Sequence, residues 1–390
     1  MKKTAFLVLI LLITFIPFVG KKTVAAEESL QSDVKFEDIL DELLKSTDTS
    51  GLEELYNEYA LSICSDKSFG DFLKDISGGN TALDYGNFFE CFANVFLKDL
   101  LGFFSIFACV VAAMTLNGLL GGISASKRAT GDVAFAVCYL SVAFFVFGET
   151  AKIATEIISF IKNVTKISER IYPVLLTLVA ASGGVSKANA LKPVCVIVTQ
   201  GVSNATVNVL LPLVTVICVL GAVSSLSERF SLKKTKDFFQ GAFKWISGIS
   251  VAVFSAFTAV SGMGAASHDG VSLRALKYAI GNAVPGVGGF AKEGIDVALA
   301  ASAVLKNSLG SVFSIALVCA FVVPLLKAIA LSLGFKMLAA IGEPLADKRI
   351  TDMISSFSGT VGMFAVILVV VFTVFFFSVY VLVFAGGTLF

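Results

Sequence analysis

The residue types that most often carry out chemistry are sparse in this chain. His268 is the only histidine. Ser267, His268 and Asp269 carry the letters of a catalytic triad, but triad members meet in space rather than as sequence neighbours. One histidine also excludes the two-histidine zinc motifs. The seven cysteines are irregularly spaced and include no Cys-x-x-Cys pair, so neither a zinc site nor a disulfide framework is indicated. We predict no catalytic residue, no metal site and no enzyme activity.

A glycine-rich string at residues 286–291, Gly-Val-Gly-Gly-Phe-Ala, fits the loose pattern of a dinucleotide-binding turn. That pattern is informative only between a strand and a helix, and the segments around this string are apolar. The chain also has no Gly-x4-Gly-Lys-Ser/Thr motif. The string is therefore interpreted as tight backbone packing or a hairpin tip, and no cofactor is predicted.

The better functional candidates surround two short apolar pieces that contain proline and glycine, at residues 171–186 and 278–291. Neither piece is long enough to span a bilayer, so each is predicted to be a re-entrant hairpin or an interfacial helix pair. Ionisable groups at membrane depth are costly and tend to face cavities or partners. The alternative for the charges here is that they lie in water beside the membrane segments. The candidate structural or interaction residues are Pro173, Arg274, Lys277, Asn282, Pro285, Gly288, Gly289 and Lys306.

The composition indicates what must position these residues. Apolar residues make up 56% of the chain and charged residues only 15%, against about 25% charged in soluble domains. A membrane crossing needs about 20 apolar residues. Uncharged stretches of sufficient length occupy 100–126, 193–227, 245–267, 307–326 and 353–390, and 133–148 is long enough with its flanks. The predicted fold is all-α, a polytopic integral membrane protein with about six transmembrane helices.

Three regions follow from the charge pattern. Residues 1–26 have a basic start, an apolar run and small residues near Ala26, which predicts a signal sequence, with an uncleaved anchor as the alternative. Residues 27–95 are predicted to form an acidic extracytoplasmic helical region, because the net charge over 27–90 is −12 and the apolar residues follow helical spacing. Residues 96–390 are predicted to form the multi-span domain.

Basic residues predict the orientation. Loops at 125–131, 228–237 and 327–352 hold 10 lysines and arginines in 43 residues, whereas loops at 150–192 and 268–306 hold 10 in 82. The first three loops are therefore predicted inside, and the acidic region outside. Paired interrupted segments also occur in transporters built from repeats, so an autonomous secondary transporter is the alternative function.

The stretch from Ser272 to Gly289, Ser-Leu-Arg-Ala-Leu-Lys-Tyr-Ala-Ile-Gly-Asn-Ala-Val-Pro-Gly-Val-Gly-Gly, continuing to Leu305-Lys306-Asn307, resembles the stage III sporulation protein AE family. So does the plan of signal, acidic segment and polytopic body. The resemblance implies a membrane component of a channel-like or secretion-like complex that links mother cell and forespore during endospore formation.

The same resemblance implies the partners and the location. The partners would be the other stage III sporulation proteins, namely the AA ATPase and the ring-forming AF, AG and AH, together with stage II sporulation protein Q. The chain would be a multi-pass protein of the mother-cell membrane that faces the forespore. The lipid bilayer is a further partner, no nucleic acid is expected, and a homo-oligomer stays open.

Overall fold

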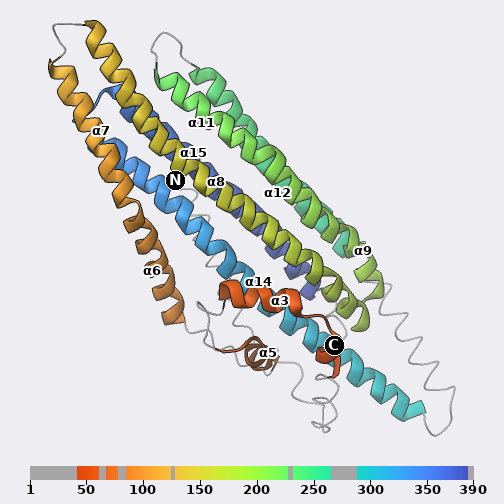
Figure 1. Cartoon of the computed structure of the whole chain (residues 1–390). Coiled ribbons are helices and arrows are strands. Elements are labelled where there is room, and N and C mark those ends of the chain that lie inside the picture. The colour runs from red at the N-terminus through yellow and green to blue at the C-terminus, as the bar shows by residue number, and fades with distance from the viewer. Residues whose placement is uncertain are drawn as a thin grey trace.

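The computed structural model describes residues 42–60, 67–77, 85–123, 128–226, 232–264 and 288–384. The regular structure in these ranges is helical throughout, which confirms the all-α prediction. The helices form one elongated bundle (Figure 1). Within the described ranges, five helical stretches are long and apolar enough to cross a membrane: Ala93–Leu120, Gly131–Ala181, Val185–Leu226, Val297–Gly342 and Lys348–Phe384. The chain is therefore a polytopic membrane protein.

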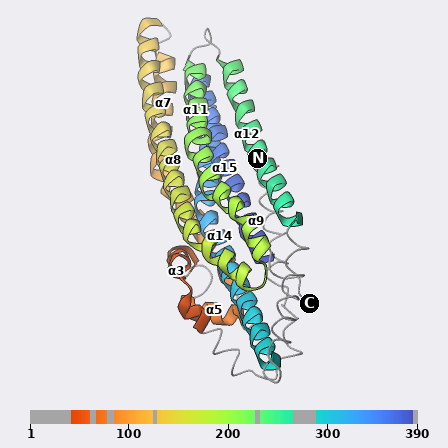
Figure 2. The ribbon, with the colours of Figure 1, turned by 90° about the vertical axis from the view of Figure 1, so that its right-hand side faces the viewer.

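The chain runs up and down this bundle. α6 (Tyr85–Gly102) and α7 (Phe104–Ile123) lead to α8 (Arg128–Ala181), and α9 (Val185–Val196) begins the return path that ends with α11 (Leu211–Leu226). The last three long helices are α12 (Lys233–Gly264), α14 (Gly288–Gly342) and α15 (Lys348–Phe384). The junctions α7–α8, α11–α12 and α14–α15 share one end of the bundle (Figures 1 and 2). These junctions adjoin the three basic loops that are predicted inside.

The helices extend much further than their uncharged stretches. α8 continues well beyond 133–148, so most of the predicted outside loop at 150–192 is helix. α14 likewise runs to Gly342, which corrects the prediction of a loop over 327–352: only a short turn separates α14 from α15. At 1.5 Å per residue, α8 and α14 are each about 80 Å long, whereas the hydrocarbon core of a bilayer is about 30 Å thick.

The first Pro/Gly piece, 171–186, contains the last part of α8, a tight turn and the first two residues of α9. α8 passes through Pro173 without a break and ends at Ala181. Pro173 is exposed, so the carbonyl group that loses its helical partner lies on the outer side. The chain reverses at Gly183, whose φ of 94° suits glycine. The N–H of Gly183 donates to the Ala180 carbonyl (3.0 Å) and that of Gly184 to the Val179 carbonyl (2.9 Å), which is a Schellman motif.

The return path from Val185 to Leu226 is one helical stretch, although it contains Pro193 and Pro212. Two π-helical turns interrupt its α-helical geometry: η3 (Ile197–Val202) and η4 (Thr206–Leu210), separated by α10 (Ser203–Ala205). η4 ends two residues before Pro212, which has no N–H to donate to the preceding turn. A wider turn accommodates this defect without ending the helix.

α14 and α15 form the centre of the bundle. The most apolar window of α14 is 72% buried inside the protein, against 12% for the α6–α7 stretch. An aromatic chain crosses the centre, with ring centroids 4.7 Å apart for Phe160 and Phe321 and 5.3 Å apart for Phe321 and Phe372. Tyr59 extends this chain to the N-terminal helices, 6.0 Å from Phe160.

The acidic N-terminal region packs directly on the long helices. α3 (Ser50–Leu55), η1 (Tyr56–Ala60) and α5 (Phe69–Ser77) lie at the end of the bundle opposite the three junctions (Figure 2). Arg170 of α8 pairs with Glu54 (3.0 Å), and Ser77 donates to Ser308 of α14 (3.1 Å). The predicted boundary between residues 95 and 96 falls inside α6, so the structure has no break there.

Several predictions lie wholly or partly outside the described residues. The predicted signal, 1–26, is outside them. The stretch 245–267 begins in α12 and runs past its end at Gly264. Of the second Pro/Gly piece, 278–291, only the last four residues are described, and they start α14.

Candidate functional site

The eight candidate residues do not form one cluster in the described structure. Arg274, Lys277, Asn282 and Pro285 lie outside the described residues. Gly288 and Gly289 are the first two residues of α14, and Pro173 is exposed near the end of α8. Lys306 has the most unusual surroundings of the set.

Lys306 lies in the bundle core. Its side chain belongs to α14 and is 0% exposed, and its Nζ has no hydrogen-bond partner among the described residues. Among the described residues, Lys187 of α9 is a charge that acts on it, and it repels the Lys306 ammonium. Burying a lone ammonium group costs several kcal/mol, about what removing the partner of a buried ion pair costs. An uncompensated buried charge in a membrane protein is a candidate for function.

Two more buried polar atoms lie close to each other on the elements around this part of α14. They are the Tyr172 hydroxyl of α8 and the Ser378 hydroxyl of α15. Tyr172 packs its ring 6.1 Å from that of Phe313, which is two helical turns from Lys306 on the same face of α14. The core between α8, α14 and α15 therefore contains several buried polar groups, and within the described part of the chain Nζ of Lys306 has no hydrogen-bond partner.

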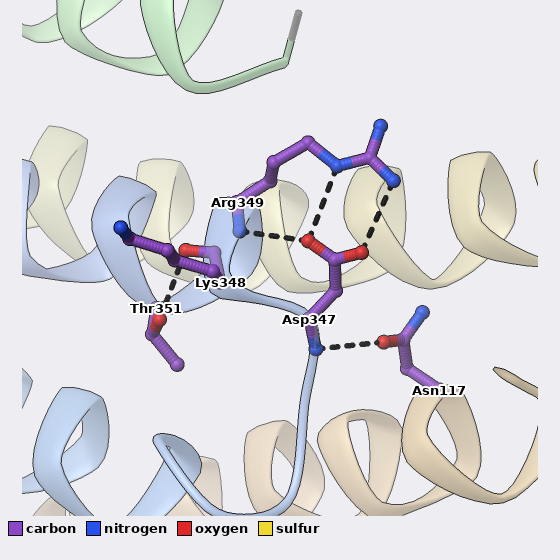
Figure 3. Close-up of polar contacts among 5 residues, drawn as sticks. All are labelled: Asn117, Asp347, Lys348, Arg349 and Thr351. Carbon is purple, nitrogen blue, oxygen red and sulfur yellow. Dashed lines mark hydrogen bonds and ion pairs between the residues drawn. The ribbon is translucent and has the colours of Figure 1, made fainter. Parts of the chain in front are cut away.

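A second site, which the sequence did not reveal, holds the α14–α15 turn against α7 (Figure 3). The N–H of Asp347 donates to Oδ1 of Asn117, a buried residue of α7, over 3.1 Å. The Asp347 carboxylate caps α15 by accepting the Arg349 N–H (2.8 Å). Both oxygens of this carboxylate also accept from the Arg349 guanidinium, each over 3.1 Å.

The Arg349 guanidinium also binds α8. Its central carbon lies 3.6 Å from the centroid of the Phe135 ring, which is a cation–π contact. Burial alone would raise the pKa of the Asp347 carboxyl, but the hydrogen bonds and charge of Arg349 outweigh this effect, so the pKa lies below its usual value. We call Asn117, Phe135, Asp347 and Arg349 the junction cluster, because they join α7, α8, α14 and α15.

Close backbone packing reinforces the junction cluster. A Cβ added at Gly118 would collide with the Leu345 carbonyl oxygen, and one at Gly342 would lie 2.7 Å from the Met114 sulfur. Gly118 and Gly122 have Gly-x-x-x-Gly spacing at the end of α7, a sequence pattern typical of close helix packing that could have pointed to this contact. The role of Asp347 had a weaker signal, an acidic residue just before the basic start of a helix.

A third group of charges joins α6, α8 and α14 at mid-length. Nζ of Lys327 lies 3.2 Å from Oε2 of Glu156. Asp99 of α6 is close enough to be influenced by both charges, and its Oδ2 is buried without a partner. Within the described ranges, no three histidine, cysteine, aspartate or glutamate residues gather as a metal site would require. The contacts at these sites hold helices and charged side chains in place.

Comparisons with known proteins agree with this architecture. The family model described as Stage III sporulation protein AE matches residues 67–386. The chain is also 26% identical over 376 residues to Stage III sporulation protein AE of Bacillus subtilis (strain 168), covering 94% of this chain and 88% of that relative. No solved structure matches the chain. Since the family match includes all the long helices and the junction cluster, the chain belongs to the stage III sporulation protein AE family.

Proposed function

We propose that this sporulation protein is the non-catalytic membrane core of a channel-like or secretion-like complex between mother cell and forespore. Its proposed partners are the AA ATPase, the ring-forming proteins AF, AG and AH of the same stage, and stage II sporulation protein Q. Its proposed location is the mother-cell membrane that faces the forespore, with α3 and α5 between the two membranes. Energy for transport would come from the separate ATPase.

The observation that best supports this proposal is the continuity of α8 and α14 through the whole bundle. The same two helices contribute apolar spans and bind the acidic N-terminal helices, through Arg170 with Glu54 and Ser77 with Ser308. The apolar helices and the acidic N-terminal region are thus one packed body. Such a body is suited to hold ring proteins on one side of the membrane and an ATPase on the other.

The transporter alternative requires helices that are broken near the middle of the membrane. In the first of the two Pro/Gly pieces, α8 is unbroken at Pro173. This piece therefore gives the alternative no support, and most of the second piece lies outside the described residues. The division into signal sequence, acidic region and multi-span domain, and the roles of the eight candidate residues, remain part of the proposal.

Affinity purification from sporulating cells tests the proposal. A tagged chain, expressed at its normal level and extracted in a mild detergent, should co-purify with at least one ring protein and the ATPase. The control is an unrelated multi-span protein with the same tag, which should recover neither. Recovery of a homogeneous, folded chain with none of these partners, after cross-linking in intact cells, would contradict the proposal.

A further inference from the structure

The outward face of α8 changes character near Glu149. Between residues 133 and 148 the exposed side chains are apolar, and Leu140 and Phe144 are 65% and 77% exposed. Beyond this point the exposed residues are almost all polar: Ala151, Lys152, Thr155, Glu156, Ser159, Lys162, Asn163, Lys166, Glu169, Arg170, Pro173 and Thr177. This polar face is about 40 Å long. Six charges on it make contact with acyl chains energetically prohibitive.

The neighbouring helices change in the same direction. On the return path, Gln200, Asn204 and Asn208 are exposed in one line along the helix, and from Val209 to Leu226 the exposed residues are mainly valines and leucines. On the other side of α8, α6 exposes Asn94 and Lys98 as well as leucines, whereas α7 exposes Phe104, Leu116 and Leu119. The apolar outer surface is therefore most continuous at one end of the bundle, where it forms a band. Beyond this band, Val185, Val196 and Ile197 of the return path and Phe377 and Phe384 of α15 are isolated exposed apolar residues.

Charged residues mark the edge of this band. Lys327 and Glu156 form their ion pair just beyond the change on α8, and Asp99 lies beside them at the end of α6. Three helices thus place charges at one level. Between this level and the junction end, α7 and the first part of α8 are each about 20 residues or 30 Å long. That length equals the thickness of the hydrocarbon core.

The apolar character of α14 and α15 continues beyond the band for a different reason. Leu305, Val312 and Phe313 of α14 and Val374 and Phe375 of α15 are buried, with 0% of each side chain exposed. They face other helices of the bundle rather than its surroundings. The uncharged run 307–326 is therefore a protein core, and its hydropathy does not indicate lipid contact.

We propose that acyl chains contact only the junction half of the bundle, and that the remaining half is a helical stalk that stands in water. The lipid-contacting half comprises α7, α8 up to Gly148, α11, residues 238–253 of α12, and the adjoining parts of α14 and α15. The exposed charges at the start of α12, Lys233, Lys234 and Asp237, lie at the membrane surface, and Lys244 is the exposed charge within 238–253. The stalk comprises the rest of α8, the first part of α14, the last part of α15, α9 and the N-terminal helices. It extends about 50 Å from the membrane, the length of α8 beyond Gly148.

Tryptophan fluorescence tests this placement, because the chain has a single tryptophan, Trp245, which is 74% exposed on α12. In nanodiscs made with brominated acyl chains, Trp245 emission should fall several-fold relative to unbrominated lipid. Two matched variants in a Trp245→Phe background then compare both halves of α8. Phe144→Trp should be quenched like Trp245, whereas Ser159→Trp should be quenched little by bromine and strongly by aqueous acrylamide. Equal quenching of both variants by brominated lipid would overturn the proposal.

The unmodified chain supplies a second measurement that does not depend on the folding of variants. In nanodiscs, a water-soluble amine reagent should modify Lys162 and Lys166 quickly and the buried Lys306 hardly at all, as read by peptide mass spectrometry. Lys162 and Lys166 that react as slowly as Lys306 would contradict a water-facing stalk. Neither measurement involves the proposed partners, so its outcome is independent of the purification experiment.

Discussion

Ser332 of α14 and Ser358 of α15 exchange hydrogen bonds across the centre of the bundle. The Ser332 hydroxyl donates to the Ser358 carbonyl over 2.9 Å, and the Ser358 hydroxyl donates to the Ser332 carbonyl over 2.8 Å. Both residues are buried. The pair fixes the register of the two central helices, because a one-residue shift of either helix would break both bonds.

Replacing either serine should weaken this contact. We expect Ser332→Ala and Ser358→Ala each to reduce stability in detergent by about 1 kcal/mol, with clear coupling in the double variant. Ser314→Ala is the matched control, because its buried hydroxyl bonds only to the Gly310 carbonyl of its own helix. Thermal unfolding monitored by circular dichroism measures all four variants. Strictly additive losses would show that the two hydroxyls do not act together.

Glycine sites between helices should be intolerant of a methyl group. A Cβ added at Gly310 would collide with Val383, and one at Gly334 with the Phe107 ring. Gly310→Ala and Gly334→Ala should therefore each cost about 1–3 kcal/mol. Gly359, where an added Cβ meets nothing within 4 Å, is the control. Gly359→Ala should be neutral or stabilising by up to about 1 kcal/mol. Val383→Ala should restore part of the stability that Gly310→Ala loses. No recovery in the double variant would show that the added methyl group does not collide with Val383.

The junction cluster should weaken in acid. Since the folded pKa of Asp347 lies below its unfolded value, its contribution is full at neutral pH. It should decline as the pH falls below about 4 and disappear below the folded pKa. Asp347→Asn retains a capping side chain but cannot titrate, so its stability should not change with pH through this group, whereas Asp347→Ala should also lose about 1 kcal/mol from the cap. Identical acid profiles for the wild-type chain and Asp347→Asn would exclude this role.

Lys306 should show opposite effects on stability and function. Lys306→Met removes an unpartnered buried charge, so the melting temperature in detergent should rise or stay unchanged. If Lys306 is an interaction residue, the same variant should form many fewer heat-resistant spores. Lys327→Met is the comparison, since it leaves Glu156 without its ion-pair partner. Normal spore counts for Lys306→Met would leave this lysine no functional role.

Sequence patterns were sufficient to predict the helical membrane fold, because long uncharged runs cannot be exposed to water in this number. They misplaced the helix ends, because the helices continue into charged segments. They also left the surroundings of each apolar face open, because hydropathy does not distinguish lipid from protein. The run 307–326 illustrates this, because it is uncharged and yet buried against other helices of the bundle. Pro173 was expected to mark a short separate element, whereas α8 continues through it, because an exposed proline is tolerated inside a long helix.

The sites were less predictable than the fold. Lys306 could be chosen from the sequence because it is a charge beside an apolar run. The junction cluster joins Asn117 to Asp347 across 230 positions, and no local spacing encodes that contact. The same is true of the pair formed by Lys327 and Glu156, which belong to helices that meet only in the folded bundle.

Photo-crosslinking in intact sporulating cells tests the central claim most directly. A photoreactive amino acid at Asn163, on the polar face of α8, should form an adduct with another sporulation protein, identified by mass spectrometry. The same amino acid at Phe144, on the apolar band, should yield lipid adducts. The same amino acid is also placed at Thr155, Ser159 and Lys166. If none of these four positions formed a protein adduct in cells that form spores normally, the result would contradict a membrane core that assembles with partners through its stalk.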